Sequence, residues 1–178
     1  MPKSKKQKSN PATTEVFPRA GFFRRLAAIV YDALMAVAVG MCAAMVMLVL
    51  LILLLENGVL EKQGLEHSSE VIRQSLLYTS ILQVWVIAWV IGFFLWFWVH
   101  GGQTIGMRAW RLRLFSLDDK PMGYGRALLR LMASLGGLGT LLVLLDIKYK
   151  QSLQDRIART EMLVLSKEAN HHKAWNKL

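Results

Sequence analysis

The sequence predicts an all-α membrane protein with two full transmembrane helices, a third short apolar segment interrupted by glycines, and a small two-stranded sheet. The run from Ala33 to Leu55 carries no charge. As a helix it extends about 34 Å, which is enough to cross a hydrocarbon core of about 30 Å. A second run, from Gln74 to Met107, contains no Asp, Glu, Lys or Arg. The 54% hydrophobic content also exceeds that of an ordinary soluble domain.

The apolar runs predict helices over about residues 22–55, 75–99 and 126–146. Arg24 and Arg25 open the first, where long side chains can reach the membrane interface. The second ends in an aromatic run, residues 93–98, which is typical of that interface. The third has an apolar stretch of only about 22 Å, residues 131–145, and glycines at 136, 137 and 139 interrupt it. The sequence therefore allows two interpretations of this segment, a short tilted span and a re-entrant hairpin.

Residues 110–117 alternate arginine with apolar residues, and this period of two predicts a strand with one wet face. Residues 162–165 form a second short apolar run, which predicts a strand over about 161–165. If these two strands pair, they must occupy the same compartment. The expected organisation is a disordered basic tail over 1–18, a membrane domain over 19–166 and a polar tail over 167–178. No cleavable signal peptide is expected.

The basic residues predict the orientation in the membrane. Lys and Arg number seven up to Arg25, two in the first connection (residues 56–74), six between Met107 and Leu131, and seven after Leu145. The positive-inside rule places the amino terminus, the second connection and the carboxyl terminus in the cytoplasm. This favours the re-entrant interpretation of the third segment. The net charge of +10 indicates anionic headgroups as partners rather than nucleic acid, because the basic residues flank apolar segments.

Asp32 is the most informative residue, because a carboxylate within a membrane helix should face protein, water or a cation. It lies about 10 Å along the axis from Arg25, too far for direct contact in a straight helix. It also belongs to a row of small residues at four-residue spacing, which lets another helix approach closely. The other members are Ala28, Ala36, Gly40 and Ala44. Asp32 could be a buried anchor paired with an arginine, or a proton or ion site.

The sequence argues against an enzyme. It contains no HExxH or GxSxG motif, and Cys42 is its one cysteine. Gly101 and Gly106 have the spacing of a phosphate loop, but Met107 and Arg108 stand where that loop needs Lys and Ser or Thr. We expect a tight turn there. No cofactor and no metal site is predicted.

Three ordered motifs resemble the RDD family of small bacterial membrane proteins, which is named for one arginine and two aspartates. They are Phe23-Arg24-Arg25 with Asp32 seven residues on, residues 102–108 (GQTIGMR), and residues 151–155 (QSLQD) followed by Thr160. The resemblance covers about residues 20–166. It implies that Arg25, with Arg24 as the alternative, Asp32 and Asp155 are the family's charged residues, and it draws attention to Gln103, Thr104, Gly106, Arg108 and Thr160. This chain departs from the family pattern at Gln154, where a histidine is common, and at Arg159, where a glycine is common.

The resemblance also implies a bacterial inner membrane. The charged residues and the row of small residues lead to two hypotheses about function. In the first, the chain is an oligomeric ion or small-solute transporter component that uses Asp32. Transport, including sodium/proton antiport, has been suggested for some family members. In the second, it is a non-catalytic structural or accessory membrane protein in which Arg25, Asp32 and Asp155 form one charge network. A homo-oligomer or an unidentified membrane partner is expected in either case.

Overall fold

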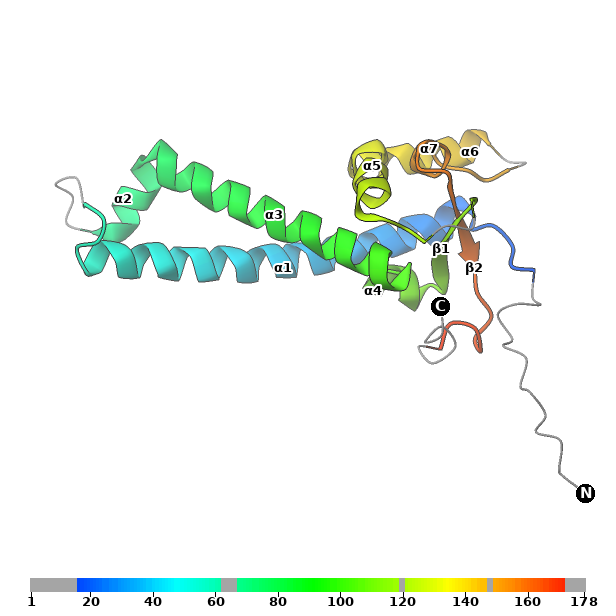
Figure 1. Ribbon diagram of the computed structural model, residues 1–178, viewed down its shortest axis with the longest axis horizontal. Helices are drawn as coiled ribbons and strands as arrows, with labels where there is room; N and C mark the ends of the chain where they lie inside the picture. Colours follow the sequence, from blue (N-terminus) through cyan, green and yellow to red (C-terminus); the bar gives the residue numbers. More distant parts are fainter. Residues whose placement is uncertain (1–15, 62–66, 119–120, 147–148, 172–178) are drawn as a thin grey trace, which may run out of the picture. The chain divides into compact units, whose positions relative to one another are not determined.

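The computed structural model describes residues 16–61, 67–118, 121–146 and 149–171 (Figure 1). The chain divides into two compact units. Unit 1 contains residues 1–32 and 97–178, and unit 2 contains residues 33–96. The predicted disorder of residues 1–15 lies outside the described residues.

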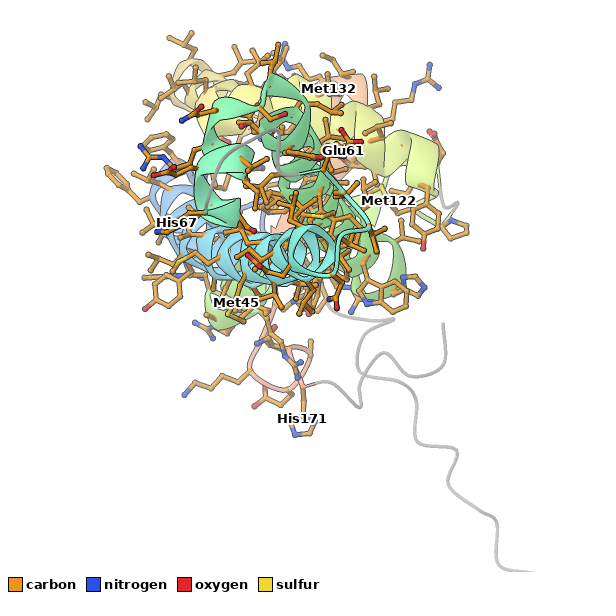
Figure 2. The ribbon with its side chains drawn as sticks, turned by 90° about the vertical axis from the view of Figure 1, so that its left-hand side faces the viewer. Met45, Glu61, His67, Met122, Met132 and His171 are labelled. Atoms are coloured by element: carbon orange, nitrogen blue, oxygen red, sulfur yellow. The ribbon has the colours of Figure 1, made fainter. Side chains whose placement is uncertain are left out.

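Unit 2 consists of most of two long helices and the short helix between them. Helix α1 spans Phe22–Glu56, α2 spans Ser68–Gln74, and α3 spans Leu76–Gly101 (Figure 1). The predictions over 22–55 and 75–99 are therefore confirmed to within about two residues. The two long helices run antiparallel, and the Trp85 indole N–H donates to the Ala43 carbonyl at 3.1 Å. Figure 2 shows Met45 extending outward from α1, one of many exposed apolar side chains on these helices.

Helix α2 was not predicted, since its residues looked like a polar connection. Its Val71 and Ile72 are buried against Leu51 and Leu55 of α1. Ser68 also donates to the Glu56 carboxylate at 2.5 Å. Two apolar residues in seven are too few to show a helical period in the sequence. Their burial is nevertheless enough to hold this short helix against α1.

Unit 1 contains the predicted sheet, which is confirmed as an antiparallel pair. Strand β1 spans Leu112–Ser116 and β2 spans Thr160–Val164, with Leu114 opposite Met162. Residues 18–20 pair with the other edge of β2: the Val164 N–H donates to the Pro18 carbonyl at 2.9 Å, and the Ala20 N–H donates to the Met162 carbonyl at 2.8 Å.

The third apolar segment is bent, as its glycines predicted. Helix α5 spans Tyr124–Ser134, the 3-10 helix η2 spans Leu135–Leu141, and α6 spans Leu142–Leu145. Gly136 and Gly137 have φ of 66° and 105°, which breaks the helical path. Helix α5 is amphipathic: Ala127, Arg130 and Ala133 are buried, while Met132 lies on the outward face (Figure 2). By length and composition, residues 124–145 are the third candidate span beside α1 and α3.

The segment between α3 and β1 also differs from its prediction. The chain turns at Gly102, where φ is 62°. It then forms a short helix, α4 (Ile105–Ala109), where only a tight turn was expected. Another short helix, α7 (Leu153–Ile157), lies just before β2 in the chain.

Candidate functional site

Asp155 lies between two arginines in the interior of unit 1. The Arg25 Nη1 donates to one carboxylate oxygen of Asp155 at 2.6 Å, and the Arg130 Nη1 donates to the other at 2.7 Å. All three side chains are essentially inaccessible to solvent. The cluster of Arg25, Asp155 and Arg130, here named the arginine clamp, joins α1, α5 and α7.

Each arginine of the clamp also binds further groups. Arg25 donates to the carbonyls of Ala20 and Lys150 and to the Ser152 hydroxyl, at 3.0 to 3.2 Å. Ser152 caps α7, and its backbone N–H donates in return to the Asp155 carboxylate at 3.2 Å. Because these bonds connect segments far apart in the sequence, the clamp fixes α1 to the carboxyl-terminal part of the chain.

Arg130 extends the clamp to β2 and to the end of α3. Its Nη1 donates to the Thr160 hydroxyl at 2.6 Å, and its guanidinium lies 5.6 Å from the centre of the Trp98 ring. A cation over an indole face at that distance is attracted to it. The clamp therefore contacts β2 and the end of α3, in addition to the three helices that it joins.

The clamp contains two guanidiniums and one carboxylate, so it buries an excess positive charge. Burial alone would raise the pKa of the Asp155 carboxyl, but the charges and hydrogen bonds of Arg130 and Arg25 hold that pKa below its ordinary value. Asp155 is therefore ionised at neutral pH. A carboxylate held in this way is a poor proton donor or acceptor.

Asp32 lies in a second cluster. The Thr104 hydroxyl donates to one of its carboxylate oxygens at 2.5 Å, and the Gly106 backbone N–H donates to the other at 2.8 Å. Thr104 also caps α4 by accepting a hydrogen bond from the Met107 N–H. We name Asp32, Thr104 and Gly106 the aspartate latch, because these bonds fasten α4 to α1.

Gly106 is required by the closeness of this contact. A Cβ atom at this position would lie 2.4 Å from the Ala28 carbonyl oxygen and 2.8 Å from an Asp32 carboxylate oxygen. Real Cβ contacts are essentially never shorter than 3.0 Å. The Ala28 carbonyl therefore lies against α4, and Ala28 itself is buried.

The predicted charge network is therefore wrong in one respect. Arg25 and Asp155 are joined as expected, but Asp32 is separate, and among the described residues it forms no ion pair with an arginine. Arg24, the alternative family arginine, is exposed. Arg130 is the functional candidate that the sequence analysis missed. Its position at the edge of an apolar segment was the available signal, because an arginine there needs a carboxylate or an aqueous neighbour.

The remaining predicted residues have structural contacts. Gln103 donates to the Leu112 carbonyl and the Asn170 side chain, and the Arg108 carbonyl accepts from Asn170. In the row of small residues, Gly40 is covered by Val86 of α3, whose methyl group would be 3.4 Å from a Cβ added at Gly40. Part of the row thus packs within the chain. Ala36 and Ala44 are half-buried.

The two departures from the family pattern now have a structural context. Gln154 is buried beside Asp155 and donates to the Thr140 hydroxyl at 2.9 Å. Arg159 has φ of 48°, in the left-handed region that favours glycine. A glycine at this position would relieve that conformation, which gives a physical reason for the family preference.

Among the described residues, no three His, Cys, Asp or Glu side chains lie close enough together to hold a metal ion. The long apolar helices, the arginine clamp and the aspartate latch define a multi-pass membrane protein with buried polar connections. The sequence model of the RDD family matches residues 19–159, so the chain belongs to the RDD family. No match was found among the curated proteins or among the solved structures.

Proposed function

We propose that this chain is a non-catalytic structural or accessory protein of the bacterial inner membrane, in which the arginine clamp holds unit 1 together. The observation that carries the proposal is the environment of Asp155. Both of its oxygens accept hydrogen bonds from buried guanidiniums, and the Ser152 backbone N–H also donates to one of them. Such a carboxylate is suited to joining segments of the chain.

The sheet supports a topology for this protein. Strand β1 precedes the third apolar segment and β2 follows it, and the two strands are paired. Both ends of that segment then lie on one side of the membrane, as a re-entrant hairpin requires. The amphipathic α5 and the break at Gly136 fit this arrangement better than a straight crossing. The concentration of Lys and Arg makes that side cytoplasmic, with both termini inside.

The test compares Asp155→Asn with Asp146→Asn. Asp146→Asn is the matched control, because Asp146 is the same residue type but its partner, Arg156, has a half-exposed side chain. Asp155→Asn should leave two buried guanidiniums without their counter-charge and reduce the yield of monodisperse protein in mild detergent. Asp146→Asn should not. Equal yields for both variants would contradict the structural role of the clamp.

Chemical cross-linking in intact membranes followed by purification should then capture a specific partner protein, and recovery of the chain alone would contradict the accessory role.

A second candidate function, ion or small-solute transport, is favoured by the aspartate latch. Asp32 lies in a candidate span, is buried, and has no cationic partner among the described residues. Two full spans are too few to enclose a pathway, so transport would require an oligomer. Because α3 already covers Gly40, an oligomer interface would use other residues of α1.

Asp32→Asn separates the two functions. Asparagine keeps the shape and can still accept the Gly106 hydrogen bond, so this variant should fold in near-normal yield. If the chain transports, sodium or proton flux in reconstituted vesicles should fall at least about tenfold, because a fixed negative charge is lost from the membrane interior. Equal flux in the wild type and in Asp32→Asn would exclude transport through Asp32.

A further inference from the structure

A groove on unit 1 is lined by two arginines and by apolar side chains. It has a volume of about 400 Å³, within the range of about 300–1,000 Å³ typical of ligand sites. Its lining comes from the chain before α1, from the first turn of α1, from the turn between α4 and β1, and from the end of β2. The lining residues are Val16, Phe17, Pro18, Arg24, Arg111, Val164, Leu165 and Ser166.

Arg24 and Arg111 are the two cations that line this groove, whereas several other arginines of unit 1 are held in ion pairs. Arg19 pairs with Glu161, Arg156 pairs with Asp146, and the clamp arginines share Asp155. Within the described residues, the side chains of Arg24 and Arg111 form no ion pair and no hydrogen bond. The groove therefore presents two guanidiniums to which none of the described residues supplies a counter-charge.

Backbone hydrogen bonds frame the groove. The Val164 N–H donates to the Pro18 carbonyl at 2.9 Å, and the Leu165 N–H donates to the Arg111 carbonyl at 2.8 Å. These bonds join the segment before α1, the end of β2 and the Arg111 backbone, which all line the groove. A ligand would thus meet a preformed site rather than a free loop.

The position of the groove fits an amphiphile. Arg24 follows Phe23, whose side chain is 80% exposed, in the first turn of the first candidate span. That turn contains no acidic residue, so the positive end of the helix dipole adds to the arginine charges. A ligand here would have an anionic group at the arginines and apolar parts along Val16, Phe17 and Val164.

We infer that this groove binds the phosphodiester headgroup of an anionic phospholipid, with Arg24 and Arg111 on the phosphate and the apolar walls against the glycerol and upper acyl chains. Guanidiniums match phosphate oxygens in bidentate geometry, which favours a phosphate over a lone carboxylate. The neighbouring sequence is a poor alternative occupant, because residues 1–15 contain four lysines and a single acid, Glu15. The inference does not depend on the proposed function.

The test uses the full chain in neutral detergent, titrated with a short-chain phosphatidylglycerol while the apparent Tm is measured. A ligand that binds only the folded state raises Tm with its concentration, which gives an apparent Kd. Arg24→Gln should weaken this Kd about tenfold, and Arg24→Gln with Arg111→Gln should weaken it further, since each substitution removes a charged hydrogen-bond donor. Arg159→Gln is the matched control. It removes the same charge from an exposed residue outside the groove and should leave the Kd unchanged.

Competing probes distinguish the sources of the anion. Short-chain phosphatidylcholine should bind at least about tenfold more weakly than phosphatidylglycerol, because its headgroup has no net charge. Equal binding would mean that the arginines do not recognise charge and would overturn the inference. Displacement of phosphatidylglycerol by inorganic phosphate at a similar concentration, or by an acidic peptide, would also overturn it, because the groove would then be a free-anion or protein site.

A second measurement does not depend on the variants folding. A phosphatidylglycerol carrying a photoreactive group near the glycerol should cross-link the wild-type chain within residues 16–24 or 164–166. Cross-links found only on the helices of unit 2 would contradict a site in this groove.

Discussion

Replacing Gly106 with alanine perturbs the aspartate latch at its closest contact. The new Cβ would lie 2.4 Å from the Ala28 carbonyl oxygen and 2.9 Å from the Asp32 carboxyl carbon. The Ala28 carbonyl belongs to the α1 backbone and cannot rotate away, so α4 must move by about 1 Å to reach an ordinary contact. Such a shift lengthens the Gly106 hydrogen bond from 2.8 Å and the Thr104 hydrogen bond from 2.5 Å.

The cost has two parts. Overpacking of this kind destabilises by about 1–3 kcal/mol, and weakening hydrogen bonds to a buried carboxylate adds about 1.5–3 kcal/mol. Together they should lower the apparent Tm of the detergent-solubilised chain by about 5–24 °C, at roughly 2–4 °C per kcal/mol for a chain of this size. The assay is the loss of the monodisperse peak in size-exclusion chromatography after heating.

Gly125→Ala is the matched control for Gly106→Ala. Gly125 lies in α5, and a Cβ there would meet no atom within 4 Å. Alanine in a helix is favoured over glycine by about 0.5–1 kcal/mol, so this Tm should stay equal or rise. A Gly106→Ala variant whose Tm lies within about 2 °C of the wild type would refute the close contact between α4 and α1.

Three further predictions concern the clamp and the third segment. Asp155→Asn should destabilise the chain by about 3–5 kcal/mol, because it leaves two buried guanidiniums unneutralised; a change below about 1 kcal/mol in thermal unfolding would contradict a buried ion cluster. The lowered pKa of Asp155 means that its contribution is complete above its ordinary value of 3.8 and is lost as the pH falls through the lower pKa of the folded state; an apparent Tm that stays level from pH 5 to pH 2 would disprove this. In a Cys42→Ser background, cysteines at Leu117 and Ser166 should react with an impermeant thiol reagent from the same side of the membrane, and a cysteine at Val59 from the other; labelling of residues 117 and 166 from opposite sides would show that the third segment crosses.

The elements that the sequence predicted correctly are those whose signals lie within a single short stretch of the chain. The charge-free runs specified α1 and α3 because any backbone in lipid must satisfy its own hydrogen bonds, and a helix does so within one segment. The alternation of arginine and apolar residues specified β1, and Gly136 and Gly137 specified the break in the third segment. Helix α2 was missed because its burial depends on Leu51 and Leu55, which lie well before it in the chain.

The sequence by itself determined that this is a membrane protein with two long spans and an interrupted third segment, and it singled out Arg25, Asp32 and Asp155 as candidate site residues. Only the tertiary structure decided how those charges are paired. Asp32 and Arg25 lie on the same helix, yet each binds a different part of the chain, Asp32 to Thr104 and Gly106 and Arg25 to Asp155. The physical reason is that a buried charge is stabilised by the groups that surround it in space. For Asp155 one of those groups is Arg130, from a helix that sequence spacing alone could not bring to it.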